Sequence, residues 1–581
     1  MTYIIGSDPG AFHIIRQAGG PDQAMQAAGL YRKAMSVIRH GVNFVQLPLE
    51  NIAEFQEPDL EGNMKKVMGM GMNFGIHGET GALGGEEIQL DSALRDYYIR
   101  IHQKVEVMLR RSADINSKYL LLHSSESRGY LQLGSHMQNT DLVDWWGRDF
   151  NILFDDVEIG NKLTMWAIYQ KYIMEIASRR LSNPDIKENI NDETEKALPN
   201  ALNMERENKR RRTGNPSDEL IDDEKTIIRN RLEAEAKKEV EKYFISTLRH
   251  FSEISEMSWG SERVAYFIVA KYLELKGDQL WKNVVNAGIA YRAKLENKKV
   301  EDWLKDNNIT EISMDNKFFR AKTVIWFPAV SAKYLWGHFS RDENPNKNDP
   351  SITDPRITDL GNMIKNRIIF VIESPMIADE DNSRLPNPLQ MLEVMKFFGH
   401  KNFGVAFDIE HILSANINPE IAFSLIGEGE GKYVRVLHVG WPSPLAPAHL
   451  PIPLGSEQQA YLYKLFYMLK QKGMGMAGDD VYIIFERGGG DDPYKQTFLA
   501  LRNMVDYLKR DVPPENLPAE FYGISTQQIL STERQLTNIK DHALDPLKGL
   551  MVVPEEEHGV LGKAALEKGK RPEEWAKEKY K

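Results

Sequence analysis

The sequence predicts an α/β fold, a (β/α)8 TIM barrel that carries a large, mainly helical insertion between its fourth and fifth strands. Short apolar, β-branched runs alternate along the 581 residues with longer stretches of helical period, which is typical of parallel strands joined by crossover helices. Eight such runs occur, and most end in a histidine or a carboxylate, at the edge where a barrel of this kind gathers its chemistry.

The eight expected strands fall into two groups of four. They cover residues 3–8, 42–48, 73–79, 119–125, 367–375, 403–411, 434–441 and 481–489. Stretches between them, such as 91–111 and 387–400, have the length and period of crossover helices. The predicted domains are the first half of the barrel at 1–128, an inserted mainly helical subdomain at 129–365, the second half of the barrel at 366–510 and a C-terminal helical extension at 511–581.

The insertion changes character along its length. Its segment 182–225 is polar and charged, and we expect a mobile loop or frayed helices there. The dense basic cluster at 209–212 is typical of a solvated loop. An apolar stripe of helical period follows, formed by Ile228, Leu232, Val240, Phe244 and Leu248.

Composition excludes several classes of site. With 73 basic and 84 acidic residues, the net charge of -11 argues against a surface uniformly attractive to polyanions, while a local basic groove is compatible with it. Because there are 0 cysteines, any metal must be held by His, Asp and Glu. No apolar run approaches the roughly 18 to 20 residues of a membrane span and no signal peptide is visible, so we expect a cytoplasmic protein.

Six of the eight expected strands end in residue types that bind metal ions. From strand three to strand eight these are His77, His123, Glu373, Asp408, His438 and Glu486. The carboxyl ends of barrel strands share one face, so we expect these side chains to converge. Carboxylates gathered there would repel one another and lose their hydration unless cations neutralised them. The pattern therefore predicts a divalent-metal site.

The ligand types indicate which ions, and how many. Imidazoles and carboxylates without thiolates suit zinc, manganese or iron better than calcium or magnesium. Three carboxylates and several imidazoles exceed one tetrahedral site, so we expect two ions or more, most simply zinc, with manganese or magnesium as the alternative. Two ions about 3.5 to 4 Å apart stabilise both the attacking and the leaving oxygen of a phosphoryl displacement, and they lower the pKa of a water molecule that bridges them. Phosphodiester hydrolysis is the reaction that such a site favours.

On these residues the chain resembles the endonuclease IV-like members (AP endonuclease family 2) of the xylose isomerase-like barrel superfamily. The resemblance covers 1–128 and 366–510. The family's histidines at the ends of strands three and four are matched by FGIHGE at His77 and LLLHSS at His123. Its strand-five glutamate is matched by FVIESP at Glu373.

The second half of the barrel continues the match. The family's Asp-x-x-His after strand six is matched by DIEH, Asp408 and His411, and its strand-seven histidine by VLHVGW at His438. The Asp-x-His of the next loop is half matched by PAHLPIPLG at His449, and the final glutamate by IIFERGG at Glu486.

The resemblance implies two or three ions and a substrate that is DNA or another phosphate-containing molecule. One ion would be held by His77, His123 and Glu373, its neighbour by Glu373, Asp408, His438 and Glu486, and a third by His411 and His449. The candidates for catalytic roles are Glu373, Glu486, His411 and His449.

Two features depart from the family pattern. Pro447 stands where the family has an aspartate, so the third site loses a carboxylate, and we expect it to be weak or empty. His411 and His449 are then free to bind a substrate phosphate or to transfer a proton. The insertion is the second departure, since it emerges near the active face and would reshape a groove for DNA.

Two other interpretations of the sequence remain open at this point. A sugar isomerase or epimerase of the same superfamily would use one divalent ion on strands five to eight, with Glu373 and Glu486 as the proton-shuttling pair. His77 and His123 discriminate, because most such isomerases give them no metal role. A further alternative is a metal-stabilised barrel whose insertion, with its aromatic pieces 144–150 and 326–339, is an interaction module.

The fifth strand has two candidates. The run 150–161 also holds a carboxylate, Glu158, at a distance from His123 that suits one βα unit. We prefer Glu373, because its run is richer in β-branched residues and a single helix leads from it to Asp408.

Overall fold

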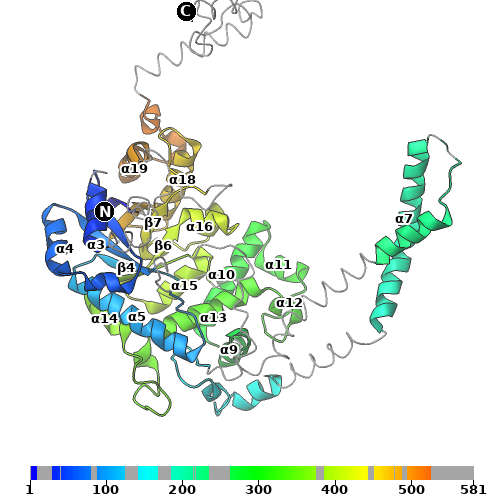
Figure 1. Cartoon of the computed structure of the whole chain (residues 1–581), viewed down its shortest axis with the longest axis horizontal. Helices are drawn as coiled ribbons and strands as arrows, with labels where there is room; N and C mark the ends of the chain where they lie inside the picture. Colours follow the sequence, from blue (N-terminus) through cyan, green and yellow to red (C-terminus); the bar gives the residue numbers. More distant parts are fainter. Residues whose placement is uncertain are drawn as a thin grey trace, which may run out of the picture. The chain divides into compact units, whose positions relative to one another are not determined.

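The computed structural model describes residues 2–9, 29–38, 41–79, 88–124, 142–167, 185–213, 215, 217–233, 262–374, 385–442, 450–476, 478–486 and 494–524 (Figure 1). By its contacts the chain divides into two compact units. The first comprises Met1–Pro451 and Met468–Pro493, and the second Ile452–Tyr467 and Tyr494–Lys581. No described helix combines the length and the apolar character needed to cross a membrane.

Eight parallel strands of the first unit close into a barrel in chain order. They are β1 (Thr2–Ser7), β2 (Phe44–Leu49), β3 (Asn73–Glu79), β4 (Tyr119–His123), β5 (Ile369–Glu373), β6 (Phe403–Asp408), β7 (Val434–Val439) and β8 (Asp480–Phe485). The ring closes where β8 pairs with β1, from Thr2 opposite Asp480 to Ser7 opposite Phe485. The predicted strands and the α/β barrel class are confirmed.

The alternation of side chains along each strand explains why apolar strands end in polar residues. Residues two apart point to the same side of a strand. One cluster fills the barrel interior, formed by Phe44, Tyr119, Leu121, Val371, Ala406, Val436, Tyr482 and Ile484. Two residues further along from Leu121, Val371, Ala406, Val436 and Ile484 stand His123, Glu373, Asp408, His438 and Glu486. The polar residues thus form the next layer of the same interior, at the carboxyl ends of the strands.

Helices alternate with the strands as the sequence predicts. Those of the first unit outside the long β4–β5 connection include α3 (Leu30–Val37), α4 (Leu60–Gly69), α5 (Arg95–Asp114), α15 (Pro388–Phe398), α16 (Ile409–Ser414) and α17 (Pro419–Ser424), with the short helices η2 (Ile52–Gln56) and η7 (Glu430–Tyr433). Local signals set the ends of α15: the Asn387 side chain accepts from the Leu389 amide, Pro388 opens the helix, and Gly399 ends it at φ 63°.

Between β4 and β5 the chain forms a set of further helices. They include η4 (Phe150–Leu153), α7 (Asp185–Thr213), α9 (Glu262–Lys276), α10 (Gln279–Leu295), α11 (Val300–Asp306), α12 (Lys317–Arg320), α13 (Thr323–His338), η5 (Arg341–Glu343) and α14 (Leu360–Arg367). α10 packs against α13 and against the barrel helix α15, and the three lie side by side in Figure 1. Gln390 of α15 joins them, because its Nε2 donates to the carbonyls of Val284 and Ile325, each at 3.2 Å. These helices therefore extend the outer helical layer of the barrel.

The aromatic pieces of this connection are mostly internal. Trp145, Trp326 and Trp336 are 3% to 4% exposed. Phe339, which follows α13, packs against Phe370 of β5 with ring centroids 4.5 Å apart and the ring planes tilted by 44°. These side chains stabilise the contact between the connection and the barrel.

The described part of the polar segment 182–225 is largely helical, which agrees with helices, the second of the two expectations, rather than with a mobile loop. Asp185–Thr213 form the 29-residue helix α7, and residues 222–233 form another helix. The expected loop at the basic cluster is therefore wrong: Lys209 lies on α7 and pairs with Glu224 at 2.7 Å. Strong helix formers and paired opposite charges account for a helix without a broad apolar face. Ile228 is buried as expected, whereas Val240, Phe244 and Leu248 lie outside the described residues.

The second unit has a small core of its own. It holds α19 (Tyr494–Lys509), the short helices η8 (Pro514–Asn516) and η9 (Ala519–Tyr522), and most of α18 (Glu457–Gln471). Phe521 is fully buried there between Tyr463 and Tyr507. Its carbonyl accepts from Gln459 and Asn503. The remainder of the predicted C-terminal extension, 525–581, lies outside the described residues.

Candidate metal centre

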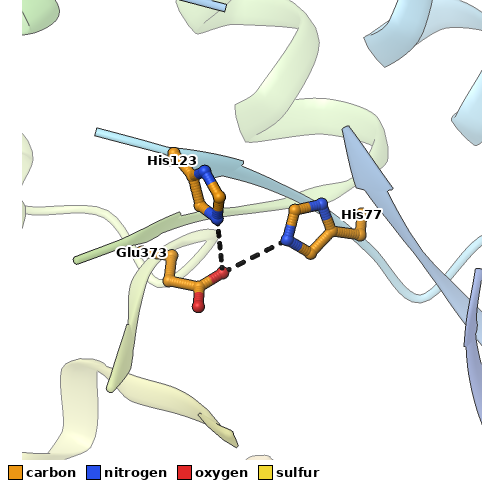
Figure 2. A group of neighbouring side chains, drawn as sticks. All are labelled: His77, His123 and Glu373. Atoms are coloured by element: carbon orange, nitrogen blue, oxygen red, sulfur yellow. Dashed lines mark ion pairs between the residues drawn. The ribbon is translucent and has the colours of Figure 1, made fainter. Parts of the chain in front are cut away.

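The carboxylate of Glu373 lies at the centre of the polar layer. Its side chain is fully buried, and on the neighbouring strand His123 is its register partner. Figure 2 shows Oε2 of Glu373 facing two imidazoles, at 3.4 Å from Nε2 of His77 and 3.5 Å from Nε2 of His123. The other oxygen, Oε1, lies 2.8 Å from Nδ1 of His438. One carboxylate thus faces two separate sets of imidazoles, one through each oxygen.

A second group of ligand types shares Glu373. Nδ1 of His438 also lies 3.1 Å from Oε2 of Glu486 and 3.7 Å from Oδ2 of Asp408. Among the described residues, two groups have ligand atoms within 4.8 Å of one another: His77, His123 and Glu373, and Glu373, Asp408, His438 and Glu486. The six strand-end residues predicted from the sequence are brought together.

Hydrogen bonds to carbonyl oxygens assign the tautomers of three imidazoles. Nδ1 of His77 lies 3.2 Å from the Gly78 carbonyl, and Nδ1 of His411 lies 2.9 Å from the Ser374 carbonyl. A carbonyl only accepts, so in both rings Nδ1 carries the proton and Nε2 has the free lone pair. In His438 the roles are reversed, because Nε2 lies 3.0 Å from Oε1 of Gln46 and Nδ1 faces the carboxylates. His77 and His411 thus present an unprotonated nitrogen to the centre, whereas Nδ1 of His438, with carboxylate oxygens at 2.8 and 3.1 Å, holds a proton that a bound cation would replace.

In this polar layer the protonation of the carboxylates and that of the imidazoles depend on each other. Burial would raise the pKa of Glu373, but the facing imidazoles, first His438 and then His77 and His123, hold it well below its usual range. Burial would lower the pKa of His438, but the Glu373 and Glu486 carboxylates, with Asp408, raise it well above its usual range. The carboxylates therefore require positive charge beside them, which a proton or a metal cation can supply.

The donor atoms fit a divalent ion. Oε2 of Glu373 and Oδ2 of Asp408 are buried and accept no hydrogen bond of normal geometry from any described residue. Leaving a buried carboxylate oxygen without a partner is costly. Distances of 3.4 and 3.5 Å from Oε2 to the two imidazole nitrogens are long for hydrogen bonds. They match the edge of about 3.4 Å that joins two ligands of a tetrahedral zinc with bonds of about 2.1 Å.

The remaining predicted residues are placed differently. His411 lies beside the centre, with Nε2 at 3.6 Å from Oδ2 of Asp408, and its backbone amide donates to Oδ1 of Asp408, which caps α16. His449 and Pro447 lie outside the described residues, so the third site stays a prediction. Glu373 ends β5, as preferred from the sequence, whereas Glu158 is exposed and pairs with Lys276 at 2.6 Å.

Two polar residues of the barrel interior were not predicted. Asp8 follows β1 and is 3% exposed, and Gln46 of β2 is fully buried. The two-residue period would place both side chains in the barrel interior, since it runs from Ile4 through Gly6 to Asp8, and from Phe44 to Gln46, but it does not reveal their roles. Gln46 stands inside its strand rather than at the end, and amides are not typical metal ligands, so it carries no metal-binding signature.

Comparison of the chain with protein-family models, with curated proteins and with solved structures gives no match in any of the three. The fold assignment therefore rests on the closed eight-stranded parallel barrel.

Proposed function

We propose that the chain is a metal-dependent phosphoester hydrolase, similar to endonuclease IV, that uses two divalent ions, best zinc, to cleave a phosphodiester. The observation that carries the proposal is the split orientation of Glu373. Its Oε2 faces His77 and His123 at 3.4 and 3.5 Å while its Oε1 faces His438 at 2.8 Å, so one carboxylate can bridge two ions. His77, His123 and Glu373 would hold the first ion, and Glu373, Asp408, His438 and Glu486 the second.

When bound, the ions would lower the pKa of an attacking water and neutralise charge on the phosphoryl oxygens. Exposure to solvent distinguishes the side chains that can transfer protons from those that can only bind metal. The side chain of Glu486 is 19% exposed while that of Glu373 is 0% exposed, so Glu486 can exchange a proton with solvent whereas Glu373 can only serve as a ligand. His411 presents Nε2 beside the centre, because its Nδ1 donates to the Ser374 carbonyl. This nitrogen can accept a proton and, once protonated, can donate to a phosphate oxygen.

The isomerase or epimerase alternative needs only the second group of residues. The proximity of His77 and His123 to Oε2 of Glu373 favours two ions over one. The interaction-module alternative is weakened by the burial of Trp145, Trp326 and Trp336, which leaves little of their aromatic surface for a partner.

Metal analysis of the purified protein tests the proposal. The variants are His77→Ala and His123→Ala. The control is His400→Ala, because His400 lies away from the centre. We expect two or three zinc equivalents in the wild type, loss of about one in each variant and no loss in the control. The two variants should also lose cleavage of bis(p-nitrophenyl) phosphate and of a DNA duplex with an abasic site. One manganese or magnesium, unchanged in both variants, would support the isomerase instead.

A further inference from the structure

Gln46 has polar contacts on three sides in the barrel interior. Its Oε1 lies 3.0 Å from Nε2 of His438 and 2.9 Å from the hydroxyl of Tyr119. Its Nε2 lies 3.4 Å from Oδ2 of Asp8. A fully buried amide in an otherwise apolar strand is costly unless such contacts satisfy it.

These contacts allow the amide only one orientation. Asp8 offers a carboxylate oxygen, which accepts, so the amide nitrogen must face Asp8 and the amide oxygen must face His438 and Tyr119. Burial and the nearby Tyr482, Asp8 and carboxylates of the centre raise the pKa of Tyr119 well above its usual value, so its hydroxyl stays a donor. The ring of Tyr119 is accommodated by Gly75, where a Cβ would lie 2.3 Å from a ring atom.

The orientation of the amide determines the tautomer of His438. An amide oxygen only accepts, so Nε2 of His438 keeps its proton, and Nδ1, which faces Glu373 and Glu486, is the nitrogen that would give up its proton to a bound cation. The opposite tautomer would set a nitrogen lone pair against the oxygen of Gln46 and turn an N–H toward the candidate metal site.

We infer that Gln46, held by Asp8 and Tyr119, is a positioning residue that fixes His438 as a metal ligand through Nδ1. The inference rests on the proposed function, since it concerns the second ion of that centre. Partners of this kind orient a ligating imidazole, and their loss typically weakens metal binding about 10- to 100-fold.

Three variants separate this role from simple packing. Gln46→Met keeps the length of the side chain and removes the acceptor. Gln46→Glu keeps an acceptor for His438, since either a carboxylate or a carboxylic acid presents an oxygen to it. Tyr119→Phe removes the second donor to Gln46 and leaves its contact with His438.

The measurement is zinc affinity by competition with a chromophoric chelator, together with the visible spectrum of the cobalt-loaded protein. We expect Gln46→Met to bind the weaker of two zinc ions about 10- to 100-fold less tightly with an altered cobalt spectrum. Gln46→Glu should bind at least as tightly as the wild type with an unaltered spectrum, and Tyr119→Phe should stay within a few-fold of it.

Zinc affinity in Gln46→Met equal to that of the wild type would overturn the inference and leave the proposed function standing. If Gln46→Met does not fold, Gln46→Glu decides: wild-type affinity supports the inference, and weakened binding overturns it. A wild type that binds no zinc would refute the proposed function itself.

Discussion

At the scale of single residues, the centre depends most on Glu373. It is fully buried, its oxygens lie 2.8 to 3.5 Å from nitrogens of four imidazoles, and it belongs to both groups of candidate ligands. The other carboxylates of the layer, Asp408 and Glu486, belong to one group each. A change at Glu373 should therefore affect both ions, and a change elsewhere only one.

Glu373→Gln should reduce the bound metal from about two equivalents to nearly none, because an amide has no negative charge and cannot bridge two cations. Glu486→Gln should lose one equivalent at most. Elemental analysis after dialysis checks both, with Glu158→Gln as the control because that exposed residue pairs with Lys276. Retention of both ions by Glu373→Gln would rule out the bridging role.

At the scale of secondary-structure elements, the strand alternation explains both what the sequence predicted and what it did not. His77, His123 and Glu373 could be predicted because a polar residue at the end of an apolar strand stands out against its neighbours. Gln46 could not, because its role comes from the side chains of Tyr119 and His438, which lie 73 and 392 residues away in the chain. The choice between a loop and helices could not be made for α7, because its sequence has the polarity of a loop, and pairing of its charges is visible only once the helix exists.

The contact between β3 and β4 leaves no room for a side chain at Gly75. A Cβ there would lie 2.3 Å from the Tyr119 ring, so Gly75→Ala should destabilise the barrel by about 1 to 3 kcal/mol. Gly69→Ala is the matched control, because nothing lies within 4 Å of its Cβ and it is in helix α4, where alanine should be neutral or stabilise by up to about 1 kcal/mol. Urea unfolding of the two variants measures the difference, and equal stabilities would contradict the close packing.

Helices α5 and α13 meet at a buried pair of neutral histidines. Nδ1 of His102 lies 3.0 Å from Nδ1 of His338, and Nε2 of His102 accepts from the Thr358 amide at 2.9 Å. Burial lowers the pKa of His102 to about 4 and that of His338 well below its usual value. Nε2 of His102 also lies 3.1 Å from the Thr358 carbonyl, so either tautomer of His102 finds a partner there. Between the two facing Nδ1 atoms there is room for one proton only, so the two rings cannot both be charged.

This pair should make stability fall with acidification. In the unfolded chain a histidine takes up a proton near pH 6.5, but folded His102 does so only near pH 4, so between these values the unfolded state binds more protons. At pH 5 the cost from His102 is about 2 kcal/mol. His102→Gln should lose less stability than the wild type between pH 7.5 and 5 in urea titrations. Identical losses in the two proteins would show that His102 does not contribute.

At the scale of the whole molecule, candidate ligands come from both halves of the barrel, with His77 and His123 from the first and Glu373 from the second. Ions that bind only the folded chain stabilise it by mass action, by about 4 kcal/mol for each ion present at 1,000 times its dissociation constant. Removal of metal with a chelator should therefore lower the melting temperature, and added zinc should restore it. Glu373→Gln provides the control, because its melting temperature should not respond to the chelator. A wild type that is equally indifferent would argue against metal in the native protein.

The pairing of β4 with β5, which are far apart in the sequence, also has a consequence for biosynthesis. Residues 124–368 separate two strands that lie side by side in the closed barrel. At about 5 to 20 residues per second, a ribosome needs on the order of 10 to 50 seconds to make that stretch. During this interval the four-stranded half of the barrel has two unpaired edges, because β1 still lacks its partner β8 and β4 its partner β5, which close the ring. Unpaired strand edges can pair with other chains. Slow translation of the long connection prolongs that exposure, and metal cannot shorten it while only two histidines of the centre have been made.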